Sequence, residues 1–313
     1  MGIVCENIDL LFASTMNAIS KHSTTKKTIL WPETPSIQQK HLSLPYLIID
    51  YIAKNPLSPE VYKKLIQCCK YFFEKMPVLV AADMFDGGRT LCPYNGEKCD
   101  DNDEECCVSI DINKLKSSIW PTNLICLDQN YYPVYHKDYY SLLCSKIYLL
   151  GTSRLCLRGI SILFDDFKIL VSAVKNVELS NVDITYNDGK PVMLEGILES
   201  IPHIKTFELR FEADYTFVPL AKIMAQLKNL DSLTLKNIPE VLNVCDLSTF
   251  IKNHKNTKIW LSFADEISDG YKARLDALID IIIETGFFDH VIQYDGQDQD
   301  KRDVLWERYH RND

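Results

Sequence analysis

An apolar-x-apolar motif recurs through the C-terminal part of the 313-residue sequence and constrains its fold more than any other feature. The motif pairs stand at Ile125/Leu127, Leu155/Leu157, Val177/Leu179, Phe207/Leu209, Leu233/Leu235 and Ile259/Leu261. Successive pairs are separated by 22 to 30 residues, a spacing typical of a solenoid whose repeat is one strand and one helix. We therefore predict an α/β fold in which a curved β/α solenoid contains a mostly parallel sheet.

Segments with apolar residues at helical spacing lie between these motifs. They cover 164–173, 192–200, 217–227, 246–253 and 270–284. Three motifs are followed at the same offset by Gly159, Asn181 or Asn237, residue types that tolerate the left-handed backbone of a strand-ending turn. A last strand at 291–294 and a charged tail over 295–313 are expected to close the stack. An ordinary α/β domain without repeats is the alternative.

The N-terminal part predicts two amphipathic helices over 41–76. Their apolar stripes are Leu44, Leu47, Ile48, Tyr51 and Ile52 in the first helix, and Val61, Leu65, Cys68, Cys69, Phe72 and Phe73 in the second. Ser58 is a favourable N-cap and Pro59 a favourable first residue for the second helix. Residues 1–40 are predicted to be an extension and connector, 77–123 to be linking strands with a Cys-rich acidic loop, and 124–294 to be the repeat domain.

Charge and cysteine content narrow the possible partners and compartments. The net charge of −9 disfavours nucleic acid as a partner, because phosphate binding needs local basicity. An odd count of 11 cysteines and an N-terminus without a basic segment disfavour a secreted disulfide framework. The apolar runs are shorter than the ~20 residues needed to cross a bilayer. We therefore predict an intracellular protein, cytoplasmic or nuclear, without a membrane partner.

The stretch from Leu44-Pro45-Tyr46-Leu47-Ile48 to Cys69-Lys70-Tyr71-Phe72 resembles an F-box. Over roughly residues 41–294, the chain is similar to a nematode-expanded family that joins an F-box-like helical module to a leucine-rich-repeat-like region. The resemblance is carried by SLPYLIIDYIAKNP, SPEVYKKLIQCCKYFF, VKNVELSNVDI, LDSLTLKNIPE and NTKIWLSFADEISDGYKARLDALIDIIIET.

This resemblance implies a target receptor of an SCF-type ubiquitin ligase, whose F-box docks on the adaptor subunit while the repeats hold a target protein. The adaptor-binding residues it implies are Leu44, Pro45, Leu47, Ile48, Ile52, Cys69 and Phe72. Asn55-Pro56 interrupts the usual run of docking positions. The alternative is a repeat-based interaction or scaffold protein without a ligase partner, in which the N-terminal helices only cap the stack.

Alternate residues of each predicted strand point away from the helices. They form two columns, Cys156, Glu178, Glu208, Thr234 and Trp260, and Arg158, Ser180, Arg210, Lys236 and Ser262. From these we predict the target-binding residues Glu178, Glu208, Arg210, Thr234, Lys236 and Trp260. Tryptophan and arginine are enriched at binding hot spots. The alternative is a solvated sheet face, with Trp260 partly covered by the C-terminal segment.

The Cys-rich acidic loop invites a zinc interpretation, which its spacing disfavours. Its thiols are Cys92, Cys99, Cys106 and Cys107, whereas structural zinc sites use closely spaced cysteine pairs. The sequence also has no phosphate-binding loop, nucleophile elbow or metalloprotease motif. We therefore predict no metal, no cofactor and no catalytic activity. A hydrolase with a Cys-His pair assembled by the fold is the remaining alternative.

Overall fold

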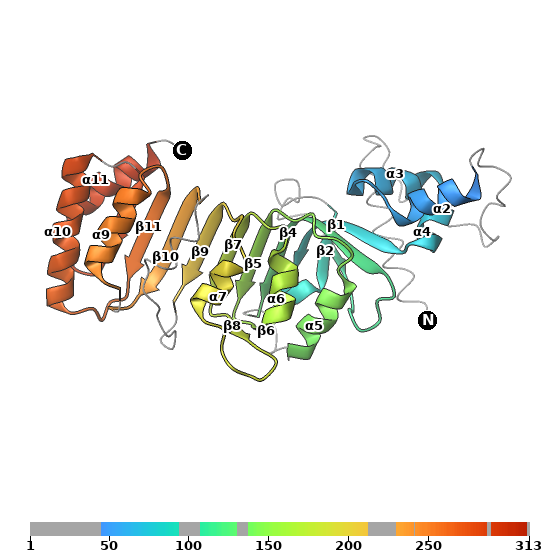
Figure 1. The fold of residues 1–313 in the computed structure, drawn as a ribbon, viewed down its shortest axis with the longest axis horizontal. Coiled ribbons are helices and arrows are strands. Elements are labelled where there is room, and N and C mark those ends of the chain that lie inside the picture. The colour runs from blue at the N-terminus through green and yellow to red at the C-terminus, as the bar shows by residue number, and fades with distance from the viewer. Residues whose placement is uncertain are drawn as a thin grey trace. The chain divides into compact units, whose positions relative to one another are not determined.

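The computed structural model describes residues 45–93, 107–129, 137–211, 230–240, 242–286 and 289–311. Two compact units divide the chain between Ser153 and Arg154. Both contain helices and strands, and parallel strand pairing predominates (Figure 1). The predicted α/β class with a mostly parallel sheet is therefore confirmed. The predicted extension 1–40, Leu44 and the predicted helix 217–227 lie outside the described residues.

The N-terminal unit begins with three short helices. They are α2 (Tyr46–Lys54), α3 (Pro59–Cys68) and α4 (Lys70–Lys75). The side chain of Ser58 accepts a hydrogen bond from the Val61 amide, so α3 starts as its sequence predicts. The single second helix predicted from the sequence is wrong, because the backbone at Cys69 is extended (φ −158°, ψ 123°) and separates α3 from α4.

Strands follow these helices in the same unit. They are β1 (Val78–Phe85), β2 (Thr90–Cys92), β3 (Val108–Ser109) and β4 (Ser118–Asp128), with the short 3-10 turn η2 (Asp86–Gly88) after β1 and the helix α5 (Lys137–Lys146) after β4. β1 pairs in parallel with β4 and antiparallel with β2, which pairs antiparallel with β3. The boundary predicted at residue 124 falls inside β4.

The C-terminal unit contains a parallel sheet whose strands lie side by side in chain order. They are β5 (Arg154–Arg158), β7 (Asn176–Ser180), β9 (Thr206–Arg210), β10 (Ser232–Ile238), β11 (Lys258–Phe263) and β12 (His290–Gln293). Leu157, Leu179, Leu209, Leu235 and Leu261 occupy one continuous register, and all are buried. The sheet is open rather than curled on itself (Figure 1), so the predicted curvature is not confirmed.

Three residues adopt the left-handed conformation at the offset that the sequence predicts: Gly159 and Asn181 directly follow β5 and β7, whereas Asn237 lies inside β10, where its register with β11 shifts. The φ angles are 64° at Gly159, 51° at Asn181 and 57° at Asn237. After the first two turns, the chain forms a second, two-stranded parallel sheet from β6 (Ser161–Leu163) and β8 (Asp183–Thr185). The left-handed backbone predicted at this offset is therefore confirmed at all three residues, and the strand-ending turn at Gly159 and Asn181.

Helices follow the strands of the C-terminal unit. Within the described residues they are α6 (Phe164–Val171), α7 (Leu194–Glu199), α9 (Val244–Asn253), α10 (Asp269–Thr285) and α11 (Gln299–His310). The segment predicted as a charged C-terminal tail, 295–313, contains the helix α11. Asp298 caps this helix by accepting a hydrogen bond from the Lys301 amide at 3.1 Å. Leu305 and Tyr309, one turn apart, are buried.

Candidate protein-binding surfaces

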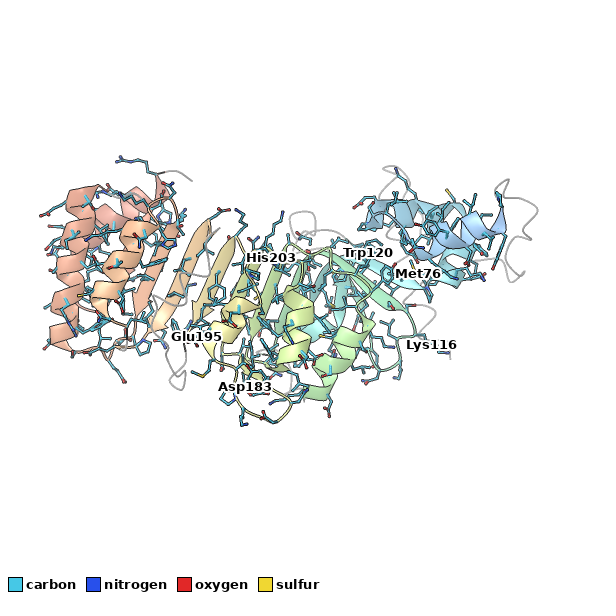
Figure 2. The ribbon with its side chains drawn as sticks, viewed as in Figure 1. Met76, Lys116, Trp120, Asp183, Glu195 and His203 are labelled. Atoms are coloured by element: carbon cyan, nitrogen blue, oxygen red, sulfur yellow. The ribbon has the colours of Figure 1, made fainter. Side chains whose placement is uncertain are left out.

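The N-terminal helices share a hydrophobic core with the strands that follow them. Ile49, Ala53, Tyr62, Ile66, Cys69, Phe72, Val78, Val80 and Trp120 form this core. Figure 2 labels Met76 and Trp120, which mark the region where the helices meet β1 and β4. The helices are therefore packed onto the N-terminal unit rather than tethered to it by a free linker.

Tyr62 fixes the junction between the helices and β1. Its hydroxyl donates a hydrogen bond to the Met76 carbonyl at 2.5 Å and accepts one from the Val78 amide at 3.2 Å. Burial raises the pKa of Tyr62 to about 12, so the phenol stays neutral at physiological pH and keeps both hydrogen bonds.

One helix of this unit exposes more apolar surface than its core uses. On α2, Leu47 is 79% exposed, Tyr51 67% and Ile48 46%, whereas Ile49 is 3% exposed. Tyr51 lies one helical turn from Leu47 and Ile48, so the three side chains share one side of the helix. We call Leu47, Ile48 and Tyr51 the α2 apolar face. Clustered exposed apolar side chains of this kind mark interaction sites.

The structure divides the predicted adaptor-binding residues into two groups. Pro45, Leu47 and Ile48 are exposed, and Ile52 is half-buried. Cys69 and Phe72 are buried in the shared core. A direct adaptor contact through Cys69 or Phe72 is therefore excluded in this conformation, and both residues stabilise the helical module instead. Leu44 precedes the described residues.

The second candidate surface is the side of the C-terminal sheet opposite its buried leucines. Residues alternating with the buried ones align across the strands in three rows. The rows are Arg154, Asn176, Thr206, Ser232 and Lys258; Cys156, Glu178, Glu208, Thr234 and Trp260; and Arg158, Ser180, Arg210 and Lys236. We call these three rows the polar face. Both predicted columns therefore exist, except that the register shifts before Ser262.

Ion pairs connect neighbouring strands on the polar face. Arg158 donates to Glu178 Oε1 from Nη2 at 2.6 Å and from Nε at 2.9 Å. Lys236 Nζ lies 2.5 Å from Glu208 Oε1. Each pair is diagonal, joining a cation to a carboxylate one row away on the next strand. Both carboxylates on this face are therefore already neutralised by cations of the same face.

The predicted target-binding residues differ in how exposed their side chains are. Arg210 is exposed, whereas Glu178, Glu208, Thr234 and Lys236 are half-buried. Cys156 of the same predicted columns is buried. The most accessible charged group among the predicted contacts is thus the Arg210 guanidinium.

The prediction for Trp260 as a freely exposed anchor is wrong. Its ring packs edge-on against Trp306 and Tyr309 of α11, with centroid distances of 5.2 and 5.3 Å. The Lys258 ammonium lies 4.3 Å from the centre of the Tyr309 ring. α11 therefore covers the Trp260 end of the polar face, as the alternative for this residue anticipated, and the indole stabilises the helix.

No group of three or more His, Cys, Asp or Glu side chains is placed to hold a metal ion in the described ranges, and Cys99 and Cys106 lie outside them. No helix in the described part of the chain is both long and apolar enough to span a bilayer.

Comparisons with known proteins add no family to these observations. No family model matches the chain, and no curated protein matches it.

Proposed function

We propose that this chain is the target receptor of an SCF-type ubiquitin ligase, a non-catalytic intracellular protein. In this proposal the α2 apolar face docks on the adaptor subunit and the polar face contacts the target protein. The observation that carries the proposal is the exposure of Leu47, Ile48 and Tyr51 on a helix whose other side is already anchored by Ile49 and Ala53.

Energetics favour a partner for this face. Burying one large apolar side chain stabilises a complex by roughly 1.5 to 3 kcal/mol before association costs. A helix that presents side chains one turn apart fits the helix-in-groove mode of recognition. The F-box resemblance supplies the identity of the partner, because Pro45, Leu47 and Ile48 belong to the stretch that carries it.

The same proposal includes a leucine-rich-repeat-like arrangement of the C-terminal unit. Main-chain hydrogen bonds repeat where its strands begin: Lys205 N donates to Lys175 O, Asp231 N to Lys205 O and Lys258 N to Asp231 O. Together with the chain-order strands and the left-handed turns, this recurrence supports stacked equivalent units. A stack of this kind presents one sheet side to a partner.

A second candidate function is a repeat-based interaction protein without a ligase partner. The observation that favours it is the shared core of the helices, β1 and β4. Helices that only cap the repeat stack need such a shared core, but they do not need Leu47 or Tyr51 to be exposed at the surface. Adaptor binding separates the two candidates.

The test measures association of the full chain with purified SCF adaptor by calorimetry. Ile48→Asp places a charge in the α2 apolar face and is expected to weaken binding by about tenfold or more. Ile169→Asp on α6 is the matched control, since Ile169 is 44% exposed, close to the 46% of Ile48. Equal binding by both variants, or no binding of the unmodified chain, contradicts adaptor docking through α2.

A further inference from the structure

The polar face differs in charge from the chain to which it belongs. The whole sequence carries −9. On the polar face, cations outnumber anions: the cations are Arg154, Arg158, Arg210, Lys236 and Lys258, and the anions are Glu178 and Glu208. Cationic side chains are thus concentrated on one side of an acidic protein.

The two ion pairs neutralise both carboxylates, so the excess positive charge of these rows lies on Arg154, Arg210 and Lys258. Arg158 is committed to Glu178, and Lys236 to Glu208. Arg210 lies opposite Ser180 on one side and Lys236 on the other. Lys258 lies over the Tyr309 ring. Arg154 and Arg210 are both exposed, but Arg154 lies opposite the neutral Asn176, whereas Arg210 lies opposite a second cation, Lys236. Arg210 is therefore an exposed cation where positive charge is concentrated across neighbouring strands.

The pairing of Arg210 with Lys236 has an energetic consequence. Like charges directly opposite each other on neighbouring strands destabilise a sheet. Glu208 pairs with Lys236 and offsets part of this repulsion. An anionic group placed beside Arg210 compensates its charge in the same way and gains the two parallel hydrogen bonds that a guanidinium offers to a carboxylate or phosphate.

We infer that the polar face binds an acidic segment of the target protein, with an anionic oxygen group seated on Arg210. This inference rests on the proposed function, which assigns the polar face to the target. The net charge of −9 on the whole chain repels an anionic peptide at long range. Short-range contacts on the polar face therefore have to supply the affinity.

The experiment uses the full chain and three fluorescent ten-residue peptides in a polarisation assay. One peptide is rich in Glu, one has Gln at the same positions, and one has phosphoserine there. We expect the Glu or phosphoserine peptide to bind and the Gln peptide not to bind. Tighter binding of the phosphoserine peptide assigns the group on Arg210 as phosphate, and tighter binding of the Glu peptide assigns it as carboxylate.

Two variants localise the site. Arg210→Glu is expected to lower the affinity for the acidic peptide by about tenfold or more, which is the scale of a lost hydrogen bond to a charged group. Arg302→Glu on α11 is the matched control, because it changes the net charge equally at an exposed position outside the three rows. Arg210→Lys, which keeps the charge and removes the planar fork, is expected to bind with intermediate affinity.

Some outcomes overturn the inference. It fails if the Gln peptide binds as well as the acidic ones, if none of the peptides binds, or if Arg210→Glu and Arg302→Glu weaken binding equally. Adaptor binding is measured in parallel and is expected to be unchanged in Arg210→Glu. If the chain binds the adaptor but no acidic peptide, only the acidic-segment inference is wrong. If it binds the acidic peptide but not the adaptor, only the ligase assignment is wrong.

Discussion

The two compact units differ in where their large apolar side chains remain exposed. In the C-terminal unit, the exposed ones are spread over several elements, with Ile169 on α6, Ile281 on α10 and Trp306 on α11. In the N-terminal unit, four of them lie together on α2, a helix of nine residues, whereas Leu57, Val61 and Leu149 lie outside that helix. Scattered exposed apolar residues are ordinary on protein surfaces, whereas a cluster is not. The comparison points to α2 as an apolar contact surface and to the polar face as a charged one.

The largest expected effect concerns the interior of the repeat sheet. Leu209→Ala removes a side chain that is 1% exposed and is expected to lower the free energy of unfolding by about 2 to 5 kcal/mol. Arg210→Ala, one residue later on the other side, is expected to change it by about 0.5 kcal/mol or less. Urea denaturation of the full chain measures both. Similar losses in the two variants contradict the inward and outward assignment of β9.

Alkaline pH is expected to destabilise both units through tyrosines with raised pKa values, among them Tyr62 in the N-terminal unit and Tyr271 in the C-terminal unit. Burial raises the pKa of Tyr62 and of Tyr271 to about 12, above the ordinary value near 10. Between these values the unfolded chain has lost the phenolic proton while the folded chain keeps it. Stability therefore falls as pH rises through this window, by roughly 1 to 3 kcal/mol per tyrosine.

Phenylalanine substitutions test this pH dependence one unit at a time. Tyr62→Phe and Tyr271→Phe are each expected to flatten the loss of stability above pH ~10, in urea titrations at matched pH. Each also loses a hydrogen bond from its hydroxyl, to Met76 O or Leu242 O. An alkaline loss as steep in both variants as in the unmodified chain rules out these tyrosines as its source.

Substitutions at the left-handed turns are expected to change stability less, and they test the backbone conformation on which the repeat assignment depends. Asn181→Val places a β-branched residue at φ 51° and is expected to cost about 1 to 2 kcal/mol. Asn181→Gly is expected to be nearly neutral, because glycine adopts this conformation without strain. Thermal unfolding compares the two variants. An equal cost for valine and glycine removes the conformational explanation for Asn at this offset.

The smallest effect on stability is expected on the α2 apolar face. Leu47→Ala removes a side chain that is 79% exposed, so the free energy of unfolding is expected to change by about 0.5 kcal/mol or less. Ile49→Ala, two residues along the same helix, is expected to cost about 2 to 5 kcal/mol. Urea denaturation of the pair distinguishes surface from core, and a large loss for Leu47→Ala means that Leu47 serves the fold.

The periodic part of the fold was predictable because each strand carries its own local signal. Leu155, Leu179 and Leu233 alternate with polar residues, and alternation in a strand directly specifies which side is buried. The left-handed positions carried an equally local signal, since few residue types other than Gly and Asn adopt them readily. The strand order also follows from similar repeats that stack on their neighbours.

The N-terminal helices were harder because their burial is decided by packing. In α2 (YLIIDYIAK) most positions are apolar, so helical spacing alone does not identify the buried side. Cys69 is neither Gly nor Pro, so no helix-breaking residue type marks the break there, and both Cys69 and Phe72 are buried in the shared core. Leu305 and Tyr309 of α11, one turn apart after the N-cap Asp298, were a signal that the surrounding charges masked.

Hydrogen exchange of the full chain with and without purified SCF adaptor tests adaptor docking through α2 directly. We expect slower exchange in the α2 segment on adding the adaptor, and unchanged exchange in β9 and β10, which belong to the polar face. Binding that protects β9 and β10 but leaves α2 unchanged contradicts this docking, as does the absence of any protection at adaptor concentrations that saturate an F-box protein.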